Sequence, residues 1–170
     1  NKYKILMHFH YQRDIFRNIQ KVQKTKKIQE DCYKIIDDLE KQFLTEDTYI
    51  ITIDPLGSKD IDDAVSVTNE NDFTIYIADT NILAPFIDQY YSNYTSVYVG
   101  THTYHLLPQI YSTNLLSLIE YNNRSSLAVN IGFNEGIPIL KSITRKTIRV
   151  SKNMIYDEAD FLILSQTKNI

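Results

Sequence analysis

Apolar side chains recur at helical spacing in the first part of the chain. Between Tyr11 and Phe43 no proline or glycine interrupts the pattern. Six side chains at three- and four-residue spacing share one face: Ile28, Cys32, Ile35, Ile36, Leu39 and Phe43. This spacing predicts a helix over residues 11–43 that buries one apolar face, with Cys32 in the core.

From Tyr49 onward the pattern becomes that of β-strands. Tyr49–Ile53 is β-branched and aromatic, and Ala64–Thr68 and Phe73–Ala78 follow as further strands joined by a polar turn at Asn69–Asp72. The stretch Leu83–Leu107 is expected to be rich in loops.

The last third of the chain predicts a hairpin and a helix. Leu127–Phe133 and Ile137–Val150 are expected to pair through the turn at residues 134–136. Tyr156–Leu164 predicts a helix whose first turns carry Asp157, Glu158 and Asp160, where carboxylates favour the helix dipole. The fold class predicted is mixed α/β (α+β), with a largely antiparallel sheet and flanking helices. We expect the acidic loop between Asp54 and Asp63 to lie at the edge of this sheet.

Composition narrows the class of protein. The chain has 170 residues, of which 43% are hydrophobic and 23% charged, as expected for one globular domain or a large piece of one. No apolar run is long enough to span a bilayer, and no signal segment opens the chain. A single cysteine excludes an internal disulfide framework and a multi-cysteine zinc site. These features predict a soluble, cytoplasmic protein with no membrane partner.

The net charge of -3 decides little, because the charges are unevenly placed. Lysines cluster near the start, at Lys21, Lys24, Lys26 and Lys27. We interpret them as a solvated helix face, with contacts to phosphate as the alternative. Acidic residues crowd instead between Asp54 and Asp63, as a metal site requires.

Four carboxylates follow the first predicted strand within ten residues: Asp54, Asp60, Asp62 and Asp63. Gathering them without a cation would raise at least one pKa, whereas Mg2+ prefers such oxygen ligands. Pro55 and Gly57 suit a turn that folds the later aspartates back toward Asp54. A solvated acidic turn is the alternative. A calcium hand fits poorly, because the sixth and twelfth positions from Asp54 are not glycine and glutamate.

The order of residues adds a family resemblance. Thr52-Ile-Asp-Pro and Ser58-Lys-Asp-Ile-Asp-Asp-Ala resemble the ribonuclease II/R (RNB) signature Thr-Ile-Asp-Pro-x-x-Ala-Lys-Asp-x-Asp-Asp-Ala, with Ser58 in place of alanine. Four further segments are similar in the same order: Tyr76–Asp79, Thr95–Tyr98 followed by Leu106–Pro108, Leu116–Leu118 through Arg124, and Ile155–Asp157. The chain departs from the family at Val99-Gly100, at Leu116 and in lacking Arg-Gly before Thr95.

The resemblance implies both domain boundaries and chemistry. Residues 1–48 would be a helical lead-in, and residues 49–170 the N-terminal, incomplete part of an RNB catalytic domain. The activity implied is metal-dependent 3′-to-5′ hydrolysis of single-stranded RNA to nucleoside 5′-monophosphates. Asp54, Asp60 and Asp63 would hold Mg2+, with Mn2+ as an alternative, and Asp62 would be the catalytic carboxylate. Tyr98 and Tyr156 match RNA-binding tyrosines of the family.

Other candidates are assigned to the fold. We expect surface or packing roles for His8, His10, His102 and His105, a structural role for Asp79 and a bracing role for Arg124. Three alternatives to the nuclease stay open: a non-catalytic RNA-binding module of the same fold, an inactive fragment of the nuclease, and an unrelated metal-stabilised domain. Further domains or chains of an RNA-degrading complex are the partners considered besides single-stranded RNA.

Overall fold

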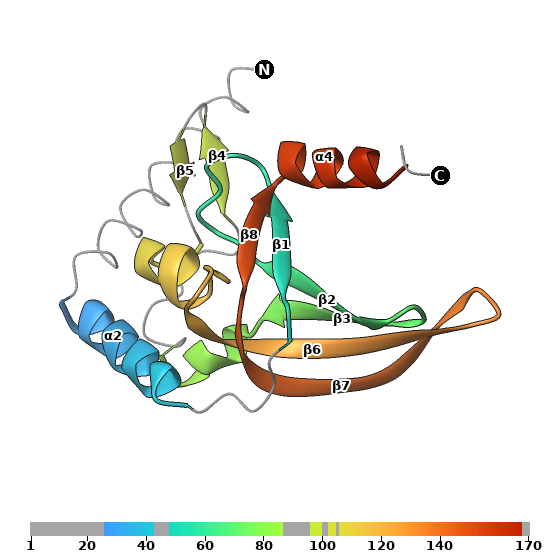
Figure 1. Ribbon diagram of the computed structural model, residues 1–170. Helices are drawn as coiled ribbons and strands as arrows, with labels where there is room; N and C mark the ends of the chain where they lie inside the picture. Colours follow the sequence, from blue (N-terminus) through green and yellow to red (C-terminus); the bar gives the residue numbers. More distant parts are fainter. Residues whose placement is uncertain (1–25, 43–47, 87–95, 100–101, 105, 168–170) are drawn as a thin grey trace, which may run out of the picture.

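A computed structural model describes residues 26–42, 48–86, 96–99, 102–104 and 106–167 (Figure 1). Its centre is a six-stranded sheet of order β7-β6-β3-β2-β1-β8, in which β1 and β8 are parallel and every other pair is antiparallel. The strands of this sheet are β1 (Ile51–Asp54), β2 (Asp63–Asn69), β3 (Asp72–Ala78), β6 (Asn123–Asn134), β7 (Ile137–Arg149) and β8 (Lys152–Ile155). The predicted α+β class with a largely antiparallel sheet is confirmed.

Helices and a small hairpin complete the described part of the chain. They are helix α2 (Lys26–Glu40), 3-10 helix η1 (Thr80–Phe86), strands β4 (Val97–Val99) and β5 (His102–Tyr104), π-helix η2 (Tyr111–Leu115) and helix α4 (Tyr156–Thr167). Helix α2 confirms the predicted helix over residues 26–40, while residues 11–25 and Phe43 lie outside the described residues.

The core lies on one face of the sheet. Ile28, Cys32 and Leu39 of α2 are at most 5% exposed and share a cluster with Tyr76 and other inward side chains of the sheet. Side chains alternate along a strand, so their neighbours point to the opposite face. On that face Val67 is 72% exposed, which leaves it open in the described part of the molecule. None of the helices in the described ranges is long and apolar enough to cross a membrane.

The long β6–β7 hairpin turns where the sequence predicts. Glu135 and Gly136 have φ of 51° and 79°, and two such residues form the tight turn that matches the twist of paired strands. β7 is an edge strand, since only β6 pairs with it. Pro138, which has no backbone N–H, is therefore tolerated near the start of this strand.

A buried arginine joins helix α2 to the sheet. Arg124 is 2% exposed and its guanidinium donates to the carbonyls of Asn114, Ser117 and Asn123 at 2.8–3.2 Å. It also lies 3.6 Å from a carboxylate oxygen of Glu40. Burial lowers the pKa of this guanidinium, and Glu40 raises it. The predicted bracing role of Arg124 is confirmed.

Asn123, the neighbour of Arg124 on β6, caps the end of α2. Its side-chain amide donates to the carbonyls of Leu39 and Gln42 at 3.0 and 3.2 Å. The carbonyl of Leu39 also accepts from the N–H of Gln42 at 3.0 Å, so the Asn123 amide is a second donor to it and fastens the end of α2 to β6.

The structure differs from the sequence-based expectation in three places. The stretch expected to be loops contains η1, β4 and β5, and β8 was not predicted. The acidic loop was expected at the edge of the sheet, yet it joins β1 and β2, which are interior strands because β8 flanks β1. β4, β5 and β8 have only three or four residues each, too few for a two-residue period to stand out.

Replacing Arg124 by methionine should lower the free energy of unfolding by about 3 kcal/mol, because several buried carbonyls lose charge-assisted hydrogen bonds. Chemical denaturation of the purified protein measures this loss. Arg149→Met is the matched control, since Arg149 also reaches Glu40 but is 49% exposed, and should cost about 1 kcal/mol or less. Equal losses in the two variants would contradict the bracing role.

The thiol of Cys32 should resist modification in the folded protein. It is fully buried, and burial raises its pKa from 9.0 to about 11, although nearby Arg124 lowers it. At pH 8 a thiol with this pKa is thiolate in roughly one molecule in a thousand. Ellman's reagent should therefore label Cys32 far more slowly in buffer than in denaturant. Because the folded pKa is raised, this thiol stabilises the fold fully below pH 9 and loses that contribution as the pH rises through about 11. Equal labelling rates in the two solutions would contradict the assignment of Cys32 to the core.

Candidate functional site

The acidic loop leaves the sheet at the end of β1 and returns at the start of β2. Asp54 is the last residue of β1 and Asp63 the first of β2. Between them the backbone reverses where Ser58 N–H donates to the carbonyl of Pro55 at 3.1 Å, with Gly57 at φ +85°. A positive φ at the third position of such a turn favours glycine. The predicted turn at Pro55 and Gly57 is thus confirmed.

The charges of the four aspartates in the loop act on one another. Desolvation raises the pKa of the Asp54 carboxyl, a hydrogen bond from the Thr52 hydroxyl lowers it, and Asp63 and Asp60 raise it further. Desolvation also raises the pKa of Asp62, with smaller contributions from Asp60, Asp63 and Asp54. The loop therefore concentrates negative charge that a cation would neutralise.

One carboxylate oxygen in the loop lacks a protein partner. Asp54 Oδ2 is buried and accepts no hydrogen bond. A buried anionic oxygen without a donor is costly, and a hard divalent cation is the ligand that such an oxygen fits. Within the described residues, however, no three carboxylate, histidine or cysteine side chains are close enough to hold a metal ion as they stand. The aspartates therefore influence one another electrostatically, but their side chains are not arranged as a complete set of metal ligands.

The second half of the loop, residues 59–62, is hydrogen-bonded mainly to the segment after η2. Ser117 Oγ donates to the carbonyl of Lys59 at 2.8 Å and accepts from the N–H of Ile61 at 3.1 Å. Leu118 N–H donates to the carbonyl of Ile61 at 2.9 Å, and Ala78 N–H donates to the carbonyl of Asp62 at 2.8 Å. Sequence reasoning did not single out Ser117, although it lies within the Leu116–Leu118 similarity.

The start of the loop, at the end of β1, is held by hydrogen bonds from β8. Asn153 Nδ2 donates to the hydroxyl of Thr52 at 2.9 Å and to the carbonyl of Leu118 at 3.0 Å. Thr52 is 1% exposed and bonds in turn to Asp54. Asn153 was also missed, since no motif in the sequence marked it.

The parallel pair β1–β8 places Tyr156 beside the loop. Asp54 is in register with Ile155, so Asp54 and Tyr156 leave the sheet at the same end (Figure 1). Helix α4 begins at Tyr156, and Glu158 accepts from the N–H of Ile155 at 3.1 Å, as a glutamate at the third helical position does. The ring of Tyr156 is 54% exposed. Tyr98 belongs to β4, but its side chain lies outside the described part of the chain.

The remaining candidates agree with their predicted roles where the structure describes them. Asp79 is 2% exposed and bonds to Arg145 at 2.6 Å and Ser125 at 3.1 Å, so it braces the sheet rather than the loop. The side chains of the four histidines and of Lys21, Lys24, Lys26 and Lys27 lie outside the described residues.

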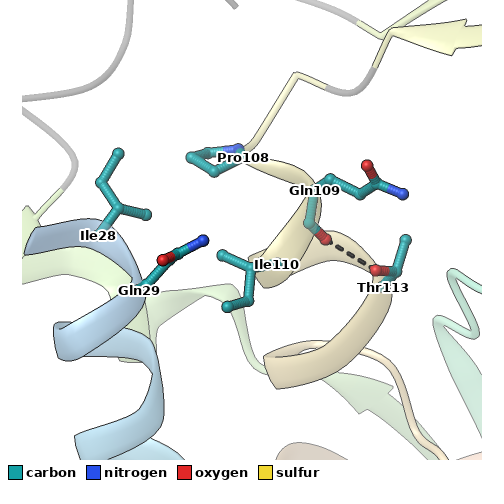
Figure 2. A pocket seen from close by; sticks show the side chains of 6 residues that line it. All are labelled: Ile28, Gln29, Pro108, Gln109, Ile110 and Thr113. Atoms are coloured by element: carbon teal, nitrogen blue, oxygen red, sulfur yellow. Dashed lines mark hydrogen bonds between the residues drawn. The ribbon is translucent and has the colours of Figure 1, made fainter. Parts of the chain in front are cut away.

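A groove of about 370 Å³ lies between α2 and η2 (Figure 2). Among the described residues it is lined by Ile28, Gln29, Pro108, Gln109, Ile110 and Thr113. None of these six side chains is acidic or basic, so they offer neither a carboxylate for a metal ion nor a charged contact for a phosphate. The acidic loop is therefore the stronger candidate for chemistry.

Comparison with known proteins agrees with the resemblance seen in the sequence. The chain is 33% identical over 126 residues to ribonuclease R of Chlamydia muridarum, covering 69% of this chain and 18% of that protein. It is 32% identical over 123 residues to ribonuclease R of Ureaplasma parvum, covering 67% and 17%. The chain thus spans under a fifth of the length of these relatives.

A solved structure shows the same fold. The RNase R of Mycoplasma genitalium in complex with ribose-methylated single-stranded RNA matches with a TM-score of 0.60 and 22% identity. The match covers 90% of this chain and 27% of that one. The family model of the RNB domain matches residues 38–169, which include the acidic loop and Tyr156, and the chain therefore belongs to the RNB domain family.

Proposed function

We propose that the protein is a metal-dependent exoribonuclease that degrades single-stranded RNA from the 3′ end to nucleoside 5′-monophosphates. The observation that carries the proposal is the acidic loop, in which buried Asp54 Oδ2 lacks a donor. Burial, and to a lesser extent the charges of Asp60, Asp63 and Asp54, raise the pKa of Asp62 in the same loop. Its relatives are ribonuclease R proteins, and the M. genitalium RNase R has been solved with single-stranded RNA.

The ligand set proposed for Mg2+ comprises Asp54, Asp60 and Asp63, with Mn2+ as an alternative ion. Asp54 would offer its unpaired oxygen, and Asp60 and Asp63 are exposed at the surface of the loop. When bound between such carboxylates and a phosphate, a divalent ion stabilises charge that develops during hydrolysis and activates water. The cation would also relieve the repulsion among the aspartates, and so draw their side chains together.

Asp62 is the proposed catalytic carboxylate. Its carbonyl is fixed by the N–H of Ala78 and its side chain is exposed, so a rigid backbone would present this carboxylate to the substrate. A carboxylate held at this point can orient an attacking water and accept its proton.

Tyr156 is proposed to hold the end of the RNA strand. Every base has a π-face, so an exposed ring beside the acidic loop can stack on any nucleotide and would not restrict the sequence degraded. Tyr98 is proposed for the same task. Cytoplasmic location and assembly with further domains or chains stay predictions.

A non-catalytic RNA-binding module is the main competing function. Four aspartates facing a phosphate backbone would weaken binding unless a cation neutralises them. The acidic loop therefore favours the nuclease over the simple binding module. A protein that binds single-stranded RNA but releases no monophosphate with Mg2+ or Mn2+ would establish the binding module instead.

In the full-length protein, Asp62→Asn should reduce Mg2+-dependent release of monophosphates by roughly 100-fold or more, as expected for loss of a positioned acid–base group. Binding of single-stranded RNA should persist, because the loop loses negative charge. Chromatography of the products and a filter-binding assay measure the two properties. Asp72→Asn is the control, since Asp72 opens β3 at the opposite end of the strand from Asp62. Unchanged turnover in Asp62→Asn would remove the proposed mechanism.

Tyr156→Leu should raise the KM for single-stranded RNA about tenfold, because stacking of one base on an aromatic ring contributes roughly 1–3 kcal/mol. Tyr156→Phe keeps the ring and should remain near the wild-type value. Tyr33→Leu provides a matched control, since Tyr33 on α2 is 60% exposed. Steady-state kinetics on a short oligonucleotide separate these variants, and equal KM values for Tyr156→Leu and Tyr33→Leu would contradict the RNA-binding role.

A further inference from the structure

We infer that Ser117 is a positioning residue for the acidic loop, fixing the backbone on both sides of Asp60 and next to Asp62. The inference rests on the proposed function and deepens it, because it names a residue that does not touch substrate yet determines where two of the aspartates lie. It follows from the hydrogen bonds of one buried hydroxyl.

The hydroxyl of Ser117 both donates a hydrogen bond to the loop and accepts one from it. A serine hydroxyl has one hydrogen to donate and lone pairs to accept with. Ser117 donates its hydrogen to the carbonyl of Lys59 at 2.8 Å and accepts from the N–H of Ile61 at 3.1 Å. The side chain is 0% exposed, so water cannot readily replace either bond. Asp60 lies between the two bonded residues.

The backbone beside Ser117 completes the hold on Ile61. Leu118 N–H donates to the carbonyl of Ile61 at 2.9 Å, so both backbone groups of Ile61 are bonded to consecutive residues. The Ile61 side chain is 7% exposed and anchors the loop in the core. Asp60 and Asp62 flank this anchored residue and are both exposed. Their directions are therefore set largely by the position of Ile61.

The backbone of Ser117 is itself fixed by hydrogen bonds to residues outside the loop. Its N–H donates to the carbonyl of Asn114 at 3.2 Å, and its own carbonyl accepts from Arg124 Nε at 3.2 Å. Arg124 is buried and bonded to three carbonyls, so it is a rigid support. The loop is thus connected to the core through a chain of fixed groups rather than through a mobile side chain.

A second buried serine, Ser126, provides a control that distinguishes loss of loop positioning from loss of overall stability. Ser126 on β6 is also 0% exposed, and its hydroxyl donates to the carbonyl of Lys146 at 3.2 Å. It lies where β6 and β7 already form a continuous ladder, and its hydroxyl bonds to β7 rather than to the acidic loop. Ser117→Ala and Ser126→Ala therefore remove the same group at the same burial from different places.

The test uses the full-length protein without RNA and measures binding of Mn2+ by electron paramagnetic resonance. Ser117→Ala should bind Mn2+ about tenfold more weakly than wild type, the lower end of the loss seen when a group that orients metal ligands is removed. Ser126→Ala should bind as wild type does, although both variants melt at a similarly lowered temperature. With RNA, Ser117→Ala should reduce kcat and leave the KM near the wild-type value.

Hydrogen exchange supplies a local measurement. The Ile61 amide should exchange faster in Ser117→Ala than in Ser126→Ala, because its acceptor is gone. Ser117→Cys keeps a weak donor and acceptor of similar shape and should recover part of the Mn2+ affinity. If Ser117→Ala does not fold, Ser117→Cys is compared with Ser126→Ala by the same measurements and decides the question.

The outcomes distinguish the two proposals. Mn2+ affinities that agree within twofold between the Ser117 and Ser126 variants would overturn the positioning role alone. Wild-type protein that binds Mn2+ but degrades no RNA would overturn the proposed function and leave the positioning role standing. Wild-type protein that binds no Mn2+ would overturn both.

Discussion

A guanidinium can leave water only if its donors find acceptors, and that requirement organises this molecule around Arg124. The side chain lies where helix α2, the segment after η2 and strand β6 meet, and its partners come from each of them. Because a change in their relative positions would leave a buried charge without acceptors, the three elements are held in one relation. The segment after η2, which contacts the acidic loop, is therefore fixed in position by its hydrogen bond to Arg124.

The topology of the sheet brings chemistry from distant parts of the chain to one end. β1 and β8 are separated by about a hundred residues, yet they are parallel and in register, so Asp54 and Tyr156 emerge together. The antiparallel return into β2 brings the other aspartates to the same end. One short parallel pair in an otherwise antiparallel sheet thus places the acidic loop and the start of α4, with the exposed residue Tyr156, at the same end of the sheet.

Long periodic elements could be predicted from the sequence, because their patterns repeat over several turns or alternations. Helix α2 and the β6–β7 hairpin are of this kind, whereas α4 was marked by the acidic residues of its first turns. β8 could not, since four residues carry too little pattern and its partner lies far away. The same holds within the site. The aspartates lie within ten residues of one another and are visible in the sequence. Ser117 and Asn153 act instead through bonds to residues 35 to 101 positions away, which leave no local signal.

Strand β7 has consequences for how the chain behaves in solution. Its 13 residues border the sheet with backbone groups on one side that no described strand pairs, and Ile137 and Leu140 are 66% and 58% exposed. Such an edge is a template on which other polypeptides can add strands. The cationic side chains along it, Lys141, Arg145 and Arg149, are each paired with a carboxylate of this chain, so little net charge opposes that addition. Self-association of concentrated protein should therefore begin at this border.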